Sequence, residues 1–270
     1  ELSDLIKSAT FIGGSVYENK KLLSVNAAYL GNLLSLDNVE KARLLDGNWK
    51  VIISENELYD YYDFLNCFTN SPQNGQKYIT ADIALEGSDI FCIGLWDGME
   101  LVEIEVVPKS GGDVVLQTIE NMAKANKVPQ RNICFDADGV GGFLQGFLKN
   151  AIAFKNNSKP YSGENYEHLK AQCYYKSAKN VKEGGYTISE RVATKMYNDK
   201  MTVRQRFLFE RKSIKRKKDT VSGKLCINPK SDMKLRLNGE SPDLMDMFMM
   251  REVFDLVPKT PNYAAGYYVP

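Results

Sequence analysis

The chain has 270 residues, of which 43% are hydrophobic; this supports one large domain, or a domain with a smaller lobe, and argues against wholesale disorder. Its formal net charge is +1. The sequence shows no signal peptide and no apolar run of roughly eighteen residues, so no membrane-spanning helix is expected.

The cysteine and histidine content narrows the chemistry that the chain can support. The five cysteines are widely spaced without a C-x-x-C pair, and their odd number favours a reduced, cytoplasmic setting over a disulfide framework. His168 is the single histidine, which disfavours structural zinc and histidine-based triads. Any metal would be held mainly by carboxylates, the ligands that Mg²⁺ and Mn²⁺ prefer.

Positive charge is concentrated in one part of the chain. Residues 200–236 contain 13 lysines and arginines against 3 acidic residues, so the remainder is acidic overall. A basic segment on an acidic body suggests a polyanionic partner such as DNA. A solvated loop or helix face explains an isolated charge run about as well.

The first 70 residues are predicted to form a partly irregular, mostly helical lobe. A helix over 37–45 has a good N-cap at Asp37 and ends before Gly47. The chain begins with Glu1 and not with Met, and its first residues are typical of a helix in the middle of a polypeptide. This suggests a fragment of a longer chain. Residues 71–75 form a linker, and the main domain is expected over 71–270.

The main domain begins with three predicted strands, and the order of elements indicates its fold. Asp97-Gly98 is a strong hairpin signal between the second and third strands. The predicted order is strands over 78–85, 90–96 and 99–107, a helix over 114–123, a strand over 132–136, a glycine-rich turn, a helix over 143–150 and a strand over 151–154. This is the order of a ribonuclease H-like α/β core, a mixed sheet flanked by helices.

Three further helices are predicted downstream, over 166–181, 189–212 and 241–256. The last has Ser241 as its N-cap and Pro242 at its first helical position.

Asp82 and Asp136 are candidate metal ligands on predicted strands. Asp82 lies within an apolar strand, where an ionised carboxylate is costly unless it is paired or binds a cation; a solvent-facing aspartate is the simpler alternative. Asp136 and Asp138 lie at the C-terminal end of the strand over 132–136, where open α/β sheets bind ligands. No G-x-x-x-x-G-K-[ST] phosphate loop occurs in the chain, and a turn with an incidental aspartate is the alternative.

Asp243 and Asp246 lie on one face of the last predicted helix. The helix dipole explains Asp243 without any ligand. Asp246 lies among leucine, methionine and phenylalanine residues, where a carboxylate needs a cation. Together with Asp82 and Asp136, these residues could hold two divalent ions that hydrolyse a phosphodiester.

In these motifs the chain resembles the C-terminal nuclease domain of bacteriophage terminase large subunits. The likeness lies in D-I-A at 82–84 followed by G-S-D at 87–89, in D-A-D-G-V-G at 136–141, and in S-P-D-L-M-D at 241–246. Residues 9–12, 29–30 and 42–49 are similar to the segment that joins the family's ATPase domain to its nuclease domain.

The resemblance implies a DNA endonuclease domain that cuts concatemeric double-stranded DNA with two Mg²⁺ or Mn²⁺ ions. It implies catalytic ligands at Asp82, Asp136 and Asp246, with Asp243 and Asp138 as further candidates and the choice within each pair open. Residues 1–70 would be the linker lobe after an ATPase domain that is absent here. The intact protein would work with a portal protein and a small terminase subunit in the host cytoplasm. Backbone phosphates would contact the basic segment at Lys212, Lys215, Arg216, Lys217, Lys218 and Lys224.

Two alternatives stay open. Another ribonuclease H-like nuclease, of resolvase or transposase type, would share the carboxylates but would prefer branched DNA. A non-catalytic DNA-binding or assembly module would use the aspartates in salt bridges.

Overall fold

The computed structural model describes residues 15–34, 44–45, 47, 56–71, 74–84, 90–108, 110–217 and 223–258, and the chain divides into two compact units, residues 1–55 and 56–270. In the first unit a 3₁₀ helix, η2 (Val16–Glu18), precedes α1 (Lys20–Val25) and α2 (Ala27–Leu34). Asn19 caps α1 by accepting a hydrogen bond from the Leu22 N–H. Most of the helix expected over 37–45 lies outside the described residues.

The second unit is built on a six-stranded mixed sheet with the strand order β5-β4-β1-β2-β3-β6. Strands β1, β2 and β3 form an antiparallel meander, whereas β4 pairs parallel with β1, β5 with β4, and β6 with β3. The bounds are β1 (Lys77–Asp82), β2 (Ile90–Asp97), β3 (Glu100–Pro108), β4 (Ile133–Asp136), β5 (Ile152–Phe154) and β6 (Thr187–Ile188). The hairpin turn at Asp97-Gly98 is confirmed, with Gly98 at a φ of 61°.

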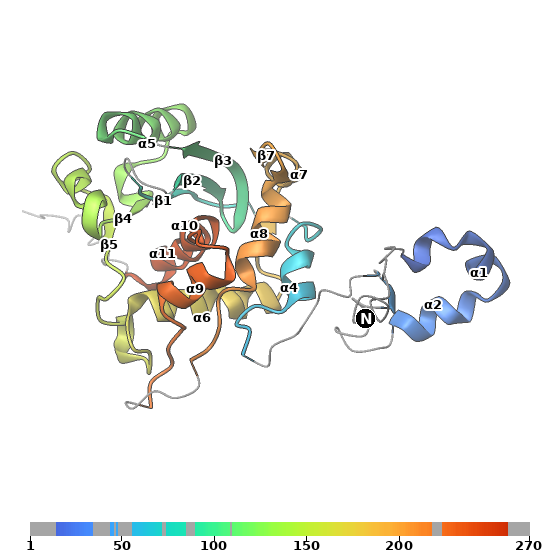
Figure 1. The fold of residues 1–270 in the computed structure, drawn as a ribbon. Coiled ribbons are helices and arrows are strands. Elements are labelled where there is room, and N and C mark those ends of the chain that lie inside the picture. Colours follow the sequence, from blue (N-terminus) through green and yellow to red (C-terminus); the bar gives the residue numbers. More distant parts are fainter. Residues whose placement is uncertain are drawn as a thin grey trace, which may run out of the picture. The chain divides into compact units, whose positions relative to one another are not determined.

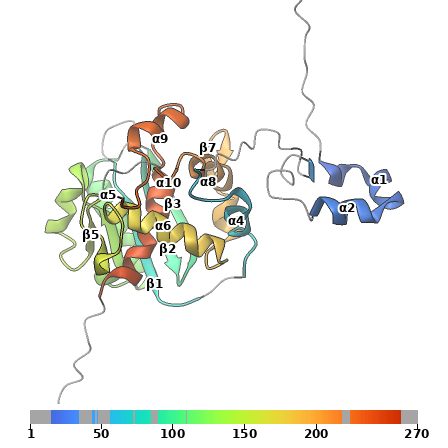
Figure 2. The same ribbon diagram turned by 90° about the horizontal axis from the view of Figure 1, so that it is seen from below.

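Helices cover both faces of this sheet (Figures 1 and 2). The odd residues of β2, such as Phe91 and Ile93, pack with Ile119 of α5 (Gly112–Asn126) in one core cluster. Cys92 and Trp96 point to the other face, into a cluster that contains residues of α4, α6, α8 and α10. The bounds of these helices are α4 (Tyr61–Asn66), α6 (Leu169–Lys182), α8 (Val203–Arg211) and α10 (Asp243–Met249).

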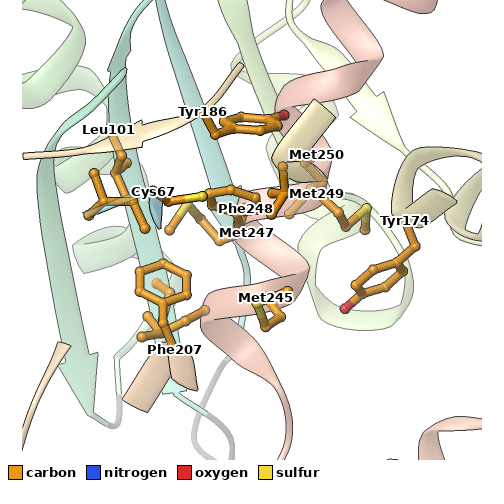
Figure 3. Packing of buried hydrophobic residues seen from close by; sticks show 14 of the residues in the cluster. Cys67, Leu101, Tyr174, Tyr186, Phe207, Met245, Met247, Phe248, Met249 and Met250 are labelled. Atoms are coloured by element: carbon orange, nitrogen blue, oxygen red, sulfur yellow. The ribbon is translucent and has the colours of Figure 1, made fainter. Parts of the chain in front are cut away.

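Helix α10 lies close against β2 because Gly94 has no side chain. A Cβ at Gly94 would lie 2.6 Å from the Met247 sulfur atom. Figure 3 shows Met247 and Phe248 of α10 packed among Phe207, Tyr186 and Leu101. The helical path continues through η7 (Met250–Glu252) and α11 (Val253–Leu256), so α10 is the first part of the helix expected over 241–256.

The prediction of a single helix over 189–212 is wrong. Residues 190–211 form α7 (Glu190–Ala193), a hairpin of β7 (Met196–Asn198) and β8 (Met201–Thr202), and then α8. The Asn198 side chain accepts hydrogen bonds from the Lys200 and Met201 N–H groups and so closes the turn. Thr202 then starts α8 with a capping box to Gln205.

The helix expected over 143–150 is also replaced, by a 3₁₀ helix, η5 (Gly139–Gly146). Glycine favours such irregular backbone, and Gly141 in particular packs so closely that a Cβ there would lie 1.8 Å from the Asp136 carbonyl oxygen. At the start of α10, Pro242 rather than Ser241 is the N-cap residue, without a side-chain cap. The buried Ser241 hydroxyl has no hydrogen-bond partner in the described part of the chain.

The remaining short elements connect these parts. They are η4 (Gln130–Asn132), η6 (Tyr161–Gly163) and α9 (Lys230–Arg236). Within the described ranges, no helix combines the length and the apolar character needed to cross a membrane.

Candidate active site

Two neighbouring parallel strands end in aspartates at the same edge of the sheet. The β1–β4 register pairs Ala81 with Phe135, and the next residue of each strand is its last, Asp82 on β1 and Asp136 on β4. These two strands are neighbours in the middle of the sheet, with β5 on one side and β2, β3 and β6 on the other. Asp82 ends its strand instead of lying within it, and it is 6% exposed.

Helix α10 brings two more carboxylates to this edge. Asp243 and Asp246 lie in its first turn and are both buried, although the helix is otherwise apolar. The backbone N–H of Ile90, the first residue of β2, donates a hydrogen bond of 3.4 Å to Asp243 Oδ2. This contact ties the start of α10 to the sheet beside the ends of β1 and β4.

The four carboxylates affect one another electrostatically. Burial raises the pKa of Asp82 well above its usual value, and the charges of Asp246, Asp243 and Asp136 raise it further, while Lys230 opposes them. Burial also raises the pKa of Asp136, and the hydrogen bond from the Asp138 N–H opposes that effect. A cluster of carboxylates that repel one another is the environment that a divalent cation would stabilise.

Helix α6 contributes a cation and a hydroxyl group to Asp246. Lys170 Nζ lies 2.8 Å from Asp246 Oδ1, and the Tyr174 hydroxyl donates a 2.5 Å hydrogen bond to the same oxygen. Lys170 and Tyr174 are one helical turn apart on α6, so they reach Asp246 from one side. Figure 3 shows Tyr174 beside the methionines of α10.

Asp136 and Asp138 have different surroundings. The exposed Asp138 accepts hydrogen bonds from the Asn156 backbone N–H at 2.9 Å and from its side-chain amide at 2.7 Å. Asp136 is more buried and accepts the Asp138 N–H at 2.9 Å. Asp138 thus ties the loop after β4 to the loop after β5, and Asp136 is the residue of the pair that interacts with Asp82 and Asp246.

A buried ion pair on α8 fixes the start of α10. Glu210 accepts a 2.9 Å hydrogen bond from the Met245 N–H, and its other oxygen lies 2.5 Å from Arg206 Nε. Arg206 in turn donates to the Ser241 carbonyl at 2.9 Å and pairs with Glu240. These contacts satisfy backbone groups on both sides of Asp243, at a helix start without a side-chain cap.

Sequence reasoning missed Lys170, Tyr174, Arg206 and Glu210. Arg206 and Glu210 carry a signal, an opposite-charge pair four residues apart within a predicted helix. Lys170 and Tyr174 have no such signal in the sequence. Nothing in the local pattern of α6 indicates which of its residues contact Asp246 of α10, more than 70 residues later in the chain.

The donor set fits a hard divalent cation in its chemistry. It consists of carboxylates from β1, β4 and α10, of which three are nearly fully buried. In the part of the chain that the structure describes, no three His, Cys, Asp or Glu side chains already stand in a metal-binding arrangement. The Lys170 ammonium group and the Tyr174 hydroxyl both contact Asp246 Oδ1.

The basic segment separates into internal and surface charges. Arg206 and Arg211 are buried in ion pairs, the latter with Glu57 at 2.9 Å. Lys215 is half-buried, Lys218 lies outside the described residues, and the other predicted phosphate contacts are exposed: Lys212, Arg216, Lys217 and Lys224. Part of the charge concentration therefore stabilises the fold.

The fold and the aspartates at its sheet edge define a ribonuclease H-like domain, as expected. No protein-family model matches the chain, and no curated protein matches it. Among solved structures, the nuclease domain of the large terminase subunit gp2 of bacterial virus Sf6 superposes with a TM-score of 0.60 at 18% identity, over 72% of this chain and 97% of that domain.

A lysine-to-alanine variant of that Sf6 domain, solved with manganese, superposes with a TM-score of 0.59 at 16% identity over the same shares of the two chains. The structure of this variant with calcium superposes with a TM-score of 0.60 at 17% identity. The fold of the chain is thus that of large terminase nuclease domains, which confirms the fold that the sequence resemblance implied.

Proposed function

We propose that the chain is a metal-dependent DNA endonuclease, the nuclease domain of a viral DNA-packaging terminase. The observation that carries this proposal is the meeting of Asp82, Asp136, Asp243 and Asp246 at one sheet edge, from segments far apart in the sequence. The Sf6 structures with manganese support the choice of a divalent ion, since they share the fold.

In this proposal Asp82 and Asp136 hold ions from the sheet, and Asp246 and Asp243 hold them from α10. Two bound ions would supply an activated water and stabilise the leaving 3′ oxygen. Asp138 positions the loops around the site through Asn156. Exposed residues of the basic segment would contact backbone phosphates, which gives affinity and register without sequence choice.

The wider role follows from the same proposal. The intact protein would carry an ATPase domain, with residues 1–70 as the connecting lobe, and would act with a portal protein and a small terminase subunit in the cytoplasm of the bacterial host. It would cut concatemeric double-stranded DNA at the start and end of packaging.

Plasmid cleavage in Mn²⁺ tests the proposal. We expect the parent protein to convert supercoiled plasmid to nicked and linear forms and Asp82→Asn to lose this activity. Asp199→Asn, at the exposed tip of the β7–β8 hairpin, is the matched control and should cut like the parent. Equal cleavage by the parent and Asp82→Asn would remove Asp82 from the site, and cleavage of branched DNA in preference to linear DNA would favour a resolvase.

A further inference from the structure

A cavity with three lysines in its wall adjoins the carboxylates. It has a volume of about 380 Å³ and is lined by five segments: the loops after β4 and β5, the start of α6, Lys217, and residues 226–233. Asp138 and Lys170 belong to its wall. Because Lys170 also lies 2.8 Å from Asp246, and the Asp138 N–H donates to Asp136, this cavity is next to the candidate active site.

The walls of the cavity combine apolar side chains with charged and polar ones. Lys170, Lys217 and Lys230 line it, and the single acidic side chain in its wall is Asp138. The carboxylate of Asp138 already accepts two hydrogen bonds from Asn156. Three ammonium groups thus share this wall with one carboxylate, and two of them also interact with carboxylates of the candidate active site, Lys170 with Asp246 and Lys230 with Asp82.

His168 lies in the same wall, with its Nε2 atom 4.0 Å from Cys226 Sγ. Its Nδ1 accepts the Ala171 N–H at 3.0 Å and caps α6, so the ring proton of the neutral form is on Nε2. Burial and the nearby Lys170 charge lower the pKa of His168, which favours that neutral form.

Backbone pairing holds Lys217 at the cavity. Residues 215–217 run antiparallel to residues 226–228, with an isolated bridge between Arg216 and Ile227. The Lys217 N–H donates to the Cys226 carbonyl at 2.9 Å, and the Lys215 N–H donates to the Asn228 side chain at 2.8 Å. The backbone of Lys217 is therefore fixed by hydrogen bonds to the segment that forms another part of the cavity wall.

We propose that this cavity binds a backbone phosphate of the DNA strand that is cut, next to the phosphate at the carboxylates. The inference rests on the proposed function and adds a substrate subsite to it. A phosphodiester is the anion that a DNA strand would place beside the carboxylates, and ammonium groups bind it without a metal. The subsite would fix the strand while divalent ions hold the reacting phosphate.

The test compares two kinds of variant, one that removes a positive charge from the cavity wall and one that fills the cavity. Lys217→Gln removes a positive charge, and Asn157→Phe, at an exposed position in the cavity wall, fills space without changing charge. Lys124→Gln, on the exposed side of α5, is the control for net charge. Binding of a fluorescent 20-base-pair duplex is measured by anisotropy in EDTA, where no cleavage occurs, at several salt concentrations.

We expect both cavity variants to bind duplex several-fold more weakly than the parent, with a salt slope smaller by roughly 0.9, the value for one lost phosphate contact. Lys124→Gln should match the parent, and the melting temperature should stay unchanged in all three variants. If Lys217→Gln alone weakens binding, the lysine acts from the surface and the cavity is not a phosphate subsite.

Two further outcomes would also overturn the inference. One is parental duplex binding in both cavity variants. The other is reduced affinity for deoxyadenosine monophosphate with unchanged affinity for DNA, which would make the cavity a site for free nucleotides. Plasmid cleavage by the parent in Mn²⁺, assayed in parallel, reports on the proposed function independently. A parent that cuts DNA, with cavity variants that bind like it, would refute the subsite alone.

Discussion

Asp82 is a buried carboxylate whose nearest charged neighbours are mostly other carboxylates. Burial and the charges of Asp246, Asp243 and Asp136 all raise its pKa, so its ionised form destabilises the metal-free fold. The charge of Lys230 opposes part of this repulsion. The residue is thus poorly explained as a stabilising ion-pair partner and well explained as a ligand.

A metal ligand and a structural ion-pair partner should respond differently to substitution, which gives a prediction about stability. Asp82→Asn keeps the side-chain shape and removes one repelling charge, so without metal the variant should melt at the same temperature as the parent or slightly higher. Mn²⁺ should raise the melting temperature of the parent, because the ion binds only the folded site, and should raise that of the variant much less. Differential scanning fluorimetry with and without Mn²⁺ measures both effects. A variant that melts several degrees lower without metal, beside a parent insensitive to Mn²⁺, would identify Asp82 as a structural residue.

The elements that carry the site are held together by the buried pair of α8. Burial raises the pKa of Glu210, and the Arg206 charge opposes this shift. Because the folded-state pKa is above the unfolded value, the folded protein retains this proton as the pH rises while the unfolded chain loses it. The contribution of Glu210 to stability is therefore fully present below the unfolded glutamate pKa and is lost as the pH rises through the folded pKa.

We accordingly expect the metal-free protein to become less stable as the pH rises from about 4.5, the ordinary glutamate value, toward 8. Glu210→Gln still offers an acceptor to the Met245 N–H but cannot titrate, so its stability should depend less on pH over this range. Urea denaturation at pH 5 and pH 8 provides the comparison, with Glu120→Gln on the exposed side of α5 as the control. Identical pH dependence in the parent and Glu210→Gln would show that Glu210 ionises normally in the fold.

The sequence predicts elements well where one local rule dominates. The meander around Asp97-Gly98, helix α5 and strand β5 follow from alternation, 3–4 spacing and turn residues. Prediction failed at β7–β8, because Met196 to Thr202 can continue a helical pattern, whereas in the structure the Asn198 side chain and the pairing of the two strands close a turn. It also failed at η5, where glycines adapt to close packing against Asp136.

The same contrast holds for the candidate site. Asp82, Asp136 and Asp246 were predictable because a carboxylate in an apolar element is locally anomalous. Lys170, Tyr174, Arg206 and Glu210 became evident only in three dimensions, since a lysine or tyrosine on a helix is ordinary until its partner is known. The cavity beside the site, formed by five separate segments, has no local signal either.

At the scale of the whole molecule, the positive charges of residues 212–224 are predicted to bind DNA without sequence preference. Replacing Lys215, Arg216, Lys217 and Lys218 with alanine should weaken binding to unrelated duplexes equally and flatten the salt dependence, because fewer counterions are released. Filter binding with two duplexes of different sequence at several salt concentrations measures this. An unchanged slope would assign the run to contacts with protein or solvent.

The order of the site residues along the chain has a consequence for biosynthesis. Strands β1 and β4 can pair once Asp136 has left the ribosome, but Asp243 and Asp246 follow more than 100 residues later. Contacts so distant in sequence form late in folding. A nascent chain therefore holds an incomplete set of carboxylates until α10 docks against β2, and by the proposed function it cannot cut DNA before that step.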